Sequence, residues 1–100
     1  MTINSSLATQ SIFVRHGFPN AASVDIGNTA NRNWLCGFIV CNINGAGNFV
    51  GYFEFAGSAT ATVIKFLGGS VTPSLTVSNG RIILSTSNYK IVNYAVLIND

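Results

Sequence analysis

The sequence predicts one all-β domain over residues 1–100, an antiparallel β-sandwich with about eight short strands. Apolar residues recur with a period of two and are mostly β-branched or aromatic, which is the pattern of strands that bury one face. Glycine or asparagine interrupts this pattern about every ten residues, the turn spacing of sandwiches and barrels. One hundred residues suffice for one domain with one modest core.

The chain begins with strands that are expected at 11–16 and, less regularly, at 22–26. Pro19, Gly27 and several asparagines make the stretch 17–32 rich in loops, with at most one short strand. Loops of this kind carry function disproportionately.

A hairpin is expected in the middle of the chain, where strands 34–43 and 49–55 are joined by a five-residue loop with two glycines. In the return strand one side carries Gly51 and three phenylalanines, so that side is expected to face the core: Phe49, Phe53 and Phe55. A further strand is expected at 61–67, where a Gly-Gly pair ends it.

The segment 75–84 carries the clearest local signal. Asn79-Gly80 can adopt the positive φ angles of a type I′ turn, which joins two strands directly. The register that follows gives three facing pairs: Val77 with Ile82, Leu75 with Leu84, and Thr76 with Ile83.

The last strand, expected at 90–98, is largely apolar on both sides. One side carries Val92, Tyr94, Val96 and Ile98, and the other carries Ile91, Asn93, Ala95 and Leu97. This strand is therefore expected to be central and buried on both faces, and one of these faces could form a subunit interface.

Charged residues make up only 8% of the chain, against about 25% in ordinary domains, while 48% of the residues are hydrophobic. Asn, Ser, Thr and Gly must therefore supply most of the solvent-facing surface. This composition suits a secreted or viral β-module, a protomer that hides part of its surface in an oligomer, or both. The net charge of +2 comes from scattered residues, so nucleic acid is not an expected partner.

Cys36 and Cys41 are the only cysteines, and they lie in one expected strand with their side chains on opposite faces. Their Cα atoms would lie about 16 Å apart, which is beyond disulfide reach. Free, buried thiols suit folding in a reducing cytosol. The start of the chain shows no signal peptide, and the longest apolar stretch, eight residues at 34–41, is too short for membrane insertion.

No catalytic, metal or cofactor site is expected. Asp25 and Glu54 would have to share a cleft for acid–base catalysis, and the single histidine, His16, would have to meet a cysteine for nucleophilic catalysis. The simpler interpretation makes Glu54 a solvent-facing strand residue and leaves the cysteines in apolar surroundings. One histidine and two opposite-facing cysteines do not make a zinc site, and the sequence has neither a calcium motif nor a nucleotide motif.

Binding residues are expected instead near the start of the third strand. Asn31, Arg32 and Trp34 combine an aromatic ring with planar polar groups, the mixture that stacks on a sugar and hydrogen-bonds its hydroxyls. Tyr52 and Tyr89 could present further rings. The alternative is that Trp34 anchors the core at a strand start and that the tyrosines pack in the core or in an interface. Both interpretations stay open at this point.

The last third of the chain carries a particular succession: Gly-Gly-Ser-Val-Thr at 68–72, Leu-Thr-Val-Ser-Asn-Gly-Arg-Ile-Ile-Leu at 75–84, Ser-Thr-Ser-Asn-Tyr at 85–89, and the apolar strand 91–98. Here the chain resembles the C-terminal domains of bacteriophage tail fibres and tailspikes, which commonly finish in such a hairpin, a Ser/Thr/Asn turn and a last hydrophobic strand. The resemblance implies a jelly-roll-like protomer of a homotrimer at the fibre tip of a virion, folded in the host cytoplasm.

The resemblance implies one of two roles for such a domain. It would bind a host-surface receptor, a glycan or a protein, or it would be a structural domain that trimerises and caps the fibre. A free-standing lectin-like module is a further alternative, because other β-sandwiches share this style of sequence, and a small enzyme is the last.

Overall fold

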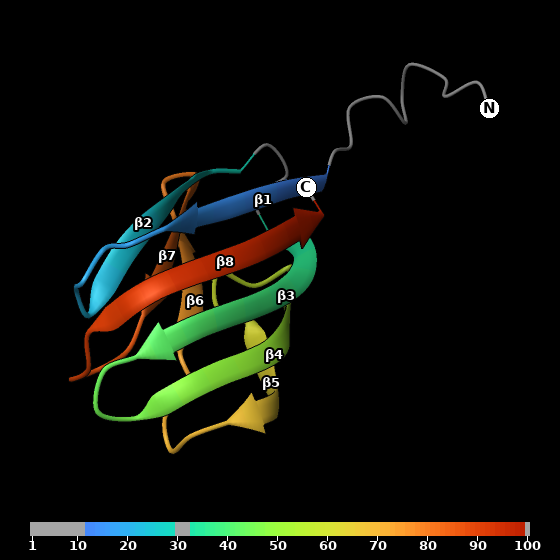
Figure 1. Ribbon diagram of the computed structural model, residues 1–100. Coiled ribbons are helices and arrows are strands. Elements are labelled where there is room, and N and C mark those ends of the chain that lie inside the picture. The colour runs from blue at the N-terminus through green and yellow to red at the C-terminus, as the bar shows by residue number, and fades with distance from the viewer. Residues whose placement is uncertain (1–11, 30–32, 100) are drawn as a thin grey trace.

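The computed structural model describes residues 12–29 and 33–99, and all regular elements in these residues are β-strands. They form two antiparallel sheets, one of five strands and one of three, that pack face to face around a single core (Figure 1). The predicted class, an all-β antiparallel sandwich of about eight short strands, is confirmed.

The larger sheet has the strand order β1-β8-β3-β4-β5, and the smaller sheet has the order β2-β7-β6. The strands of the larger sheet are β1 Ile12–Gly17, β8 Ile91–Asn99, β3 Trp34–Ile43, β4 Gly47–Ala56 and β5 Thr62–Gly68. Those of the smaller sheet are β2 Ser23–Asn28, β7 Arg81–Ser85 and β6 Ser74–Ser78. The ends of the expected strands are shifted by at most two residues.

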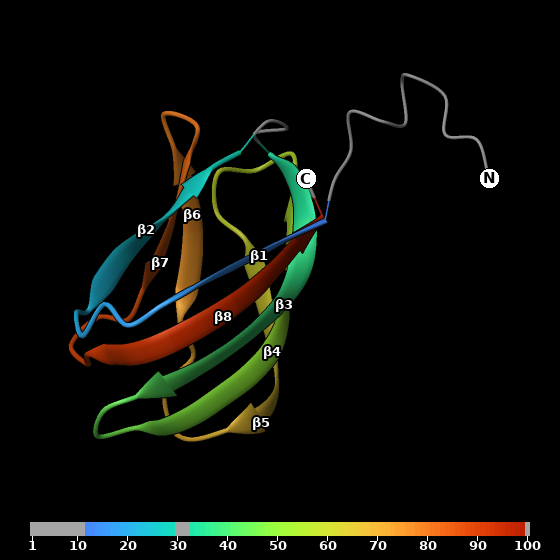
Figure 2. The same ribbon diagram turned by 45° about the horizontal axis from the view of Figure 1, so that its top comes forward.

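Early strands pair with late ones in both sheets: β1 pairs with β8, and β2 pairs with β7. This nested pairing wraps the chain around the core in a jelly-roll-like way, whereas β3, β4 and β5 follow one another as a meander. Figure 2 shows the smaller sheet on one side of the molecule and the curved larger sheet on the other.

The core consists of inward-facing side chains from both sheets. The phenylalanine side of β4 lies in it as predicted, because Phe49, Phe53 and Phe55 are all buried. Burying each aromatic side chain stabilises the fold by roughly 1.5–3 kcal/mol. The core residues that surround these rings come from β3, β8 and the smaller sheet: Leu35, Ile39, Cys41, Val96, Ile98, Ile26, Leu75, Ile82 and Leu84.

β6 and β7 form the predicted hairpin. Asn79 and Gly80 have φ angles of 52° and 75°, the pair of positive values that a type I′ turn requires. The three predicted facing pairs all occur in the register of this hairpin. A purely local signal was therefore sufficient to place both strands.

The hairpin of β3 and β4 has a shorter loop than predicted. Ile43 pairs with Gly47, so only residues 44–46 form the loop, where five residues were expected. Gly45 and Gly47 both have a φ of 85°, a conformation that glycine adopts without strain, and this lets the strands pair up to a tight turn.

β8 lies inside the larger sheet, between β1 and β3, but its two faces differ from the prediction. A register shift pairs Ile91 with Ile43, and Val92 bulges from the ladder. Ile91 therefore turns into the core, although simple alternation placed it on the opposite side. Val92 and Leu97 both remain 37% exposed, so the prediction that β8 is buried on both faces is wrong for the single chain.

Gly37 and the two cysteines show how β3 packs on its two faces. A Cβ atom on Gly37 would lie 1.7 Å from the carbonyl oxygen of Leu97, so only glycine fits at this position. Cys41 points into the core and Cys36 points outward, and both are free thiols on opposite faces as predicted. Cys36 is only partly buried, so the expectation of two buried thiols holds for Cys41 alone.

Candidate functional site

The outer face of the larger sheet carries the candidate site. The strand register aligns one residue from each strand in a row that crosses all five strands: Val14, Leu97, Phe38, Tyr52 and Ile64. Val14, Phe38 and Ile64 expose 60%, 49% and 50% of their surface. A continuous apolar row thus faces away from the core.

A second row runs beside the first one. It consists of His16, Ala95, Val40, Val50 and Leu67. Phe66, next to an irregularity in β5, reaches over the same face, and its ring centroid lies 6.3 Å from that of Phe38. Phe38 also meets Tyr52 edge to face, with centroids 5.9 Å apart. We call these two rows together with Phe66 the apolar face.

Polar residues border the apolar face on both sides. The row on the side of Trp34 is polar except for Ile12 on β1, which is 70% exposed, and Cys36: its members are Ile12, Asn99, Cys36, Glu54 and Thr62. On the other side lie Asn42, Asn93 and Asn48, and the Asn42 side-chain amide donates a hydrogen bond of 2.7 Å to the side-chain oxygen Oδ1 of Asn93. An apolar centre with a polar rim is the usual anatomy of a protein–protein interface.

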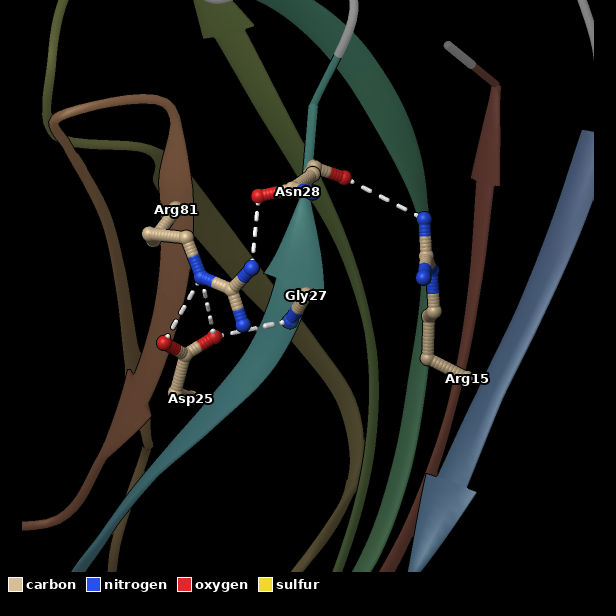
Figure 3. A network of polar contacts seen from close by, with 5 residues as sticks. All are labelled: Arg15, Asp25, Gly27, Asn28 and Arg81. Carbon is tan, nitrogen blue, oxygen red and sulfur yellow. Dashed lines mark hydrogen bonds and ion pairs between the residues drawn. The ribbon is translucent and has the colours of Figure 1, made fainter.

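The outer face of the smaller sheet is built differently (Figure 3). Arg81 forms an ion pair of 2.9 Å with Asp25 and also donates a hydrogen bond to the Asn28 side chain. The Arg81 guanidinium holds the pKa of Asp25 below its usual value of 3.8. From β1, Arg15 donates a hydrogen bond of 3.2 Å to the backbone carbonyl of Asn28 and so links the two sheets. The charges of Arg81 and Asp25 on this face are therefore paired with each other, whereas the buried Nε of Arg15 has no hydrogen-bond partner among the described residues.

A shallow hollow of ≈ 240 Å³ lies at the end of the larger sheet where β3 begins. Its lining includes Trp34, Cys36, Tyr52 and Glu54. Trp34 is 65% exposed, so the interpretation that it anchors the core is wrong. Its indole rests against the backbone at Gly57, where a Cβ atom would come within 2.9 Å of Trp34 Cζ2.

The structure brings together two of the five predicted binding residues. Trp34 and Tyr52 line the same hollow. Tyr89 lies beside Gly45, at the opposite end of β3, and the length of that strand separates it from Trp34 by about 30 Å. The predicted residues Asn31 and Arg32 lie outside the described residues.

Sequence reasoning missed the apolar face, although one signal for it was present. In β3 and in β8 both phases of the alternation are apolar, but this was recognised only for β8. Phe38 and Val40 are in phase with Trp34 on the outer side of β3. The charged residues make up only 8% of the chain, and the outward-facing residues of β3 are apolar as well as the inward-facing ones. These two observations together could have located the apolar face from the sequence.

The catalytic pairs considered from the sequence are not formed. Asp25 and Glu54 lie on the outer faces of different sheets, with the core between them. Cys36 shares its row with Ile12, about 13 Å along β1 from His16. Cys41 faces the core, and burial raises the pKa of its thiol to about 11. In residues 12–29 and 33–99, no group of three or more His, Cys, Asp or Glu side chains could hold a metal ion.

The candidate site therefore consists of the apolar face, its polar rim and the hollow beside Trp34. The described part of the chain has no helix with the length and apolarity to cross a membrane. The chain matches no protein-family model, no curated protein and no solved structure.

Proposed function

We propose that the chain is a non-catalytic assembly and attachment domain, the protomer of a homotrimer of the kind that ends a bacteriophage fibre. The observation that carries this proposal is the apolar face, because large exposed apolar patches on a folded domain mark interaction surfaces. In this assembly the apolar face of each copy packs against the other copies, and the remaining surface is left for attachment to a host.

The size of the face is that of a small interface. Five strands spaced about 4.8 Å apart cover about 24 Å, and the two apolar rows with the neighbouring asparagine row cover about 20 Å. The footprint is therefore about 490 Å² before side-chain relief is counted, a little more than half of the ~800 Å² that each partner buries in a standard interface.

A second copy of this chain is the partner that fits the face best. The two apolar rows carry no carboxylate, lysine or arginine, so they attract no partner of opposite charge. The inner face of the same sheet already packs against another sheet, and the outer face offers the same kind of surface for sheet-on-sheet packing. Three copies with their apolar faces turned to a common axis would leave the polar faces of the smaller sheets in water.

The mass of the chain in solution tests this proposal directly. Size-exclusion chromatography with light scattering, at micromolar concentration, is expected to give three times the 10.6 kDa of one chain. A mass of twice the single-chain value would support assembly through the apolar face but would make the assembly a dimer and not a trimer. A monomer that persists at rising concentration would contradict the proposal.

A further inference from the structure

The hollow beside Trp34 has an aromatic wall. The backbone amide of Gly57 donates a hydrogen bond of 2.7 Å to the carbonyl of Asn33, and Gly57 has a φ of 82°. This turn brings bare backbone against one part of the indole, and most of the ring stays in solvent. A tryptophan side chain has only two torsion angles to fix, so an exposed indole can bind a ligand with little loss of conformational entropy.

Two polar groups lie in the same hollow. Glu54 is exposed, and its carboxylate makes no hydrogen bond or ion pair with a described residue. Partial removal from water, the charge of Glu54 and the Cys36 thiol raise the pKa of Tyr52 above its usual value. The Tyr52 hydroxyl therefore keeps its proton at neutral pH and can donate a hydrogen bond, while Glu54 can accept several.

We infer that this hollow binds a neutral pyranose sugar, with the Trp34 indole stacked on the apolar C–H face of the ring and Glu54 accepting hydrogen bonds from its hydroxyl groups. The inference rests on the attachment role proposed above and gives it a place and a ligand class. A volume of ≈ 240 Å³ is below the range of drug-sized pockets and suits one small ring. The carboxylate of Glu54 disfavours acidic sugars.

The chemistry of the rim favours a sugar here over a further protein contact. Packing another subunit over Glu54 would bury a carboxylate that has no described partner, which is costly. A sugar instead offers hydroxyl donors to that carboxylate and leaves part of it in water. The hollow borders the apolar face at Tyr52, so it stays at the rim of the proposed assembly.

Trp34 is the only tryptophan in the chain, so its fluorescence reports on this site alone. The full chain would be titrated with neutral methyl pyranosides of glucose, mannose and galactose, and with glucuronate as the acidic comparison. At least one neutral sugar is expected to shift the emission to shorter wavelength in a saturable way, and glucuronate is expected to bind more weakly. The inference is overturned if no neutral sugar produces the shift, or if glucuronate binds more tightly.

Variants then test the roles of the two residues by saturation-transfer NMR on the sugar. Trp34→Ala and Glu54→Gln are each expected to weaken binding about tenfold, and Trp34→Phe is expected to retain part of it. Tyr89→Ala, an exposed aromatic residue at the other end of β3, is the matched control and is expected to bind normally. Wild-type affinity in Trp34→Ala would refute the site. Light scattering on the same samples keeps the two proposals apart, because a trimer without sugar binding refutes only the site, and a monomer that binds sugar refutes only the assembly.

Discussion

Phe38→Asp places a charge at the centre of the apolar face, and its effect can be worked out from the exposure of Phe38. This residue exposes 49% of its surface in the single chain. An aromatic residue buries about 200 Å² in all, so about 100 Å² of Phe38 remains available to an interface. At about 25 cal/mol per Å², its loss weakens each association step by about 2.5 kcal/mol, or roughly 70-fold. The unpaired carboxylate would add to this loss.

The assay is a dilution series of wild type and Phe38→Asp, with the mass followed by light scattering and the fold by circular dichroism. The variant is expected to dissociate at a concentration where wild type remains assembled, and to keep its β-sheet spectrum because Phe38 lies outside the core. Tyr89→Asp adds the same charge away from the apolar face and is expected to assemble like wild type. Equal masses for wild type and Phe38→Asp throughout the series would show that the apolar face does not hold the copies together.

Three further predictions concern the fold. Gly37→Ala is expected to lower the free energy of unfolding by several kcal/mol because the new Cβ atom clashes with the Leu97 carbonyl oxygen. Gly80→Ala has nothing within 4 Å of the added atom, so it is expected to lower this free energy by only about 1–2 kcal/mol, the strain of an alanine at positive φ. Urea denaturation measures both changes. The thiol of Cys41, with its pKa raised from 9.0 to about 11, is expected to stay unreactive to a thiol reagent at about pH 8 until the chain is unfolded. Because the unfolded thiol ionises first, stability should also fall as the pH rises from 9 towards 11. The pKa of Asp25 is lowered in the folded chain, so the ionised carboxylate stabilises the fold above pH 3.8, and this stabilisation is lost as the pH falls through the folded-state pKa. Asp25→Asn is expected to remove this dependence of stability on acid pH. Urea denaturation midpoints measured across the acid range check this prediction.

Local signals in the sequence were sufficient for the strands and for one hairpin. Asn79-Gly80 specifies its turn through backbone conformation alone, so the pairs around it follow without knowledge of the rest of the chain. In β4 the phenylalanines lie on one face of the strand, and Val50, Tyr52 and Glu54 lie on the other face. This difference in polarity between the two faces identified the buried side.

The errors arose where both phases of a strand are apolar. In β8 neither phase is polar enough to fix the register, so the bulge at Val92 cannot be read from alternation. In β3, Trp34, Phe38 and Val40 alternate with Leu35, Ile39 and Cys41, so both phases are apolar and alternation alone could not decide that Trp34 faces outward. The hollow joins β3 to β4 across the sheet, and no local pattern reports which polar residues meet there.

The pairing of β1 with β8 sets the order in which this molecule can fold. Ile12 meets Asn99, so the ladder between β1 and β8 cannot close until all the residues from 12 to 99 have been synthesised. The hairpins of β3 with β4 and of β6 with β7 need only short loop closures and can form much sooner. Contacts between such distant segments make folding slow, and until β8 docks, a newly made chain leaves the neighbouring edges of β1 and β3 unpaired and open to aggregation.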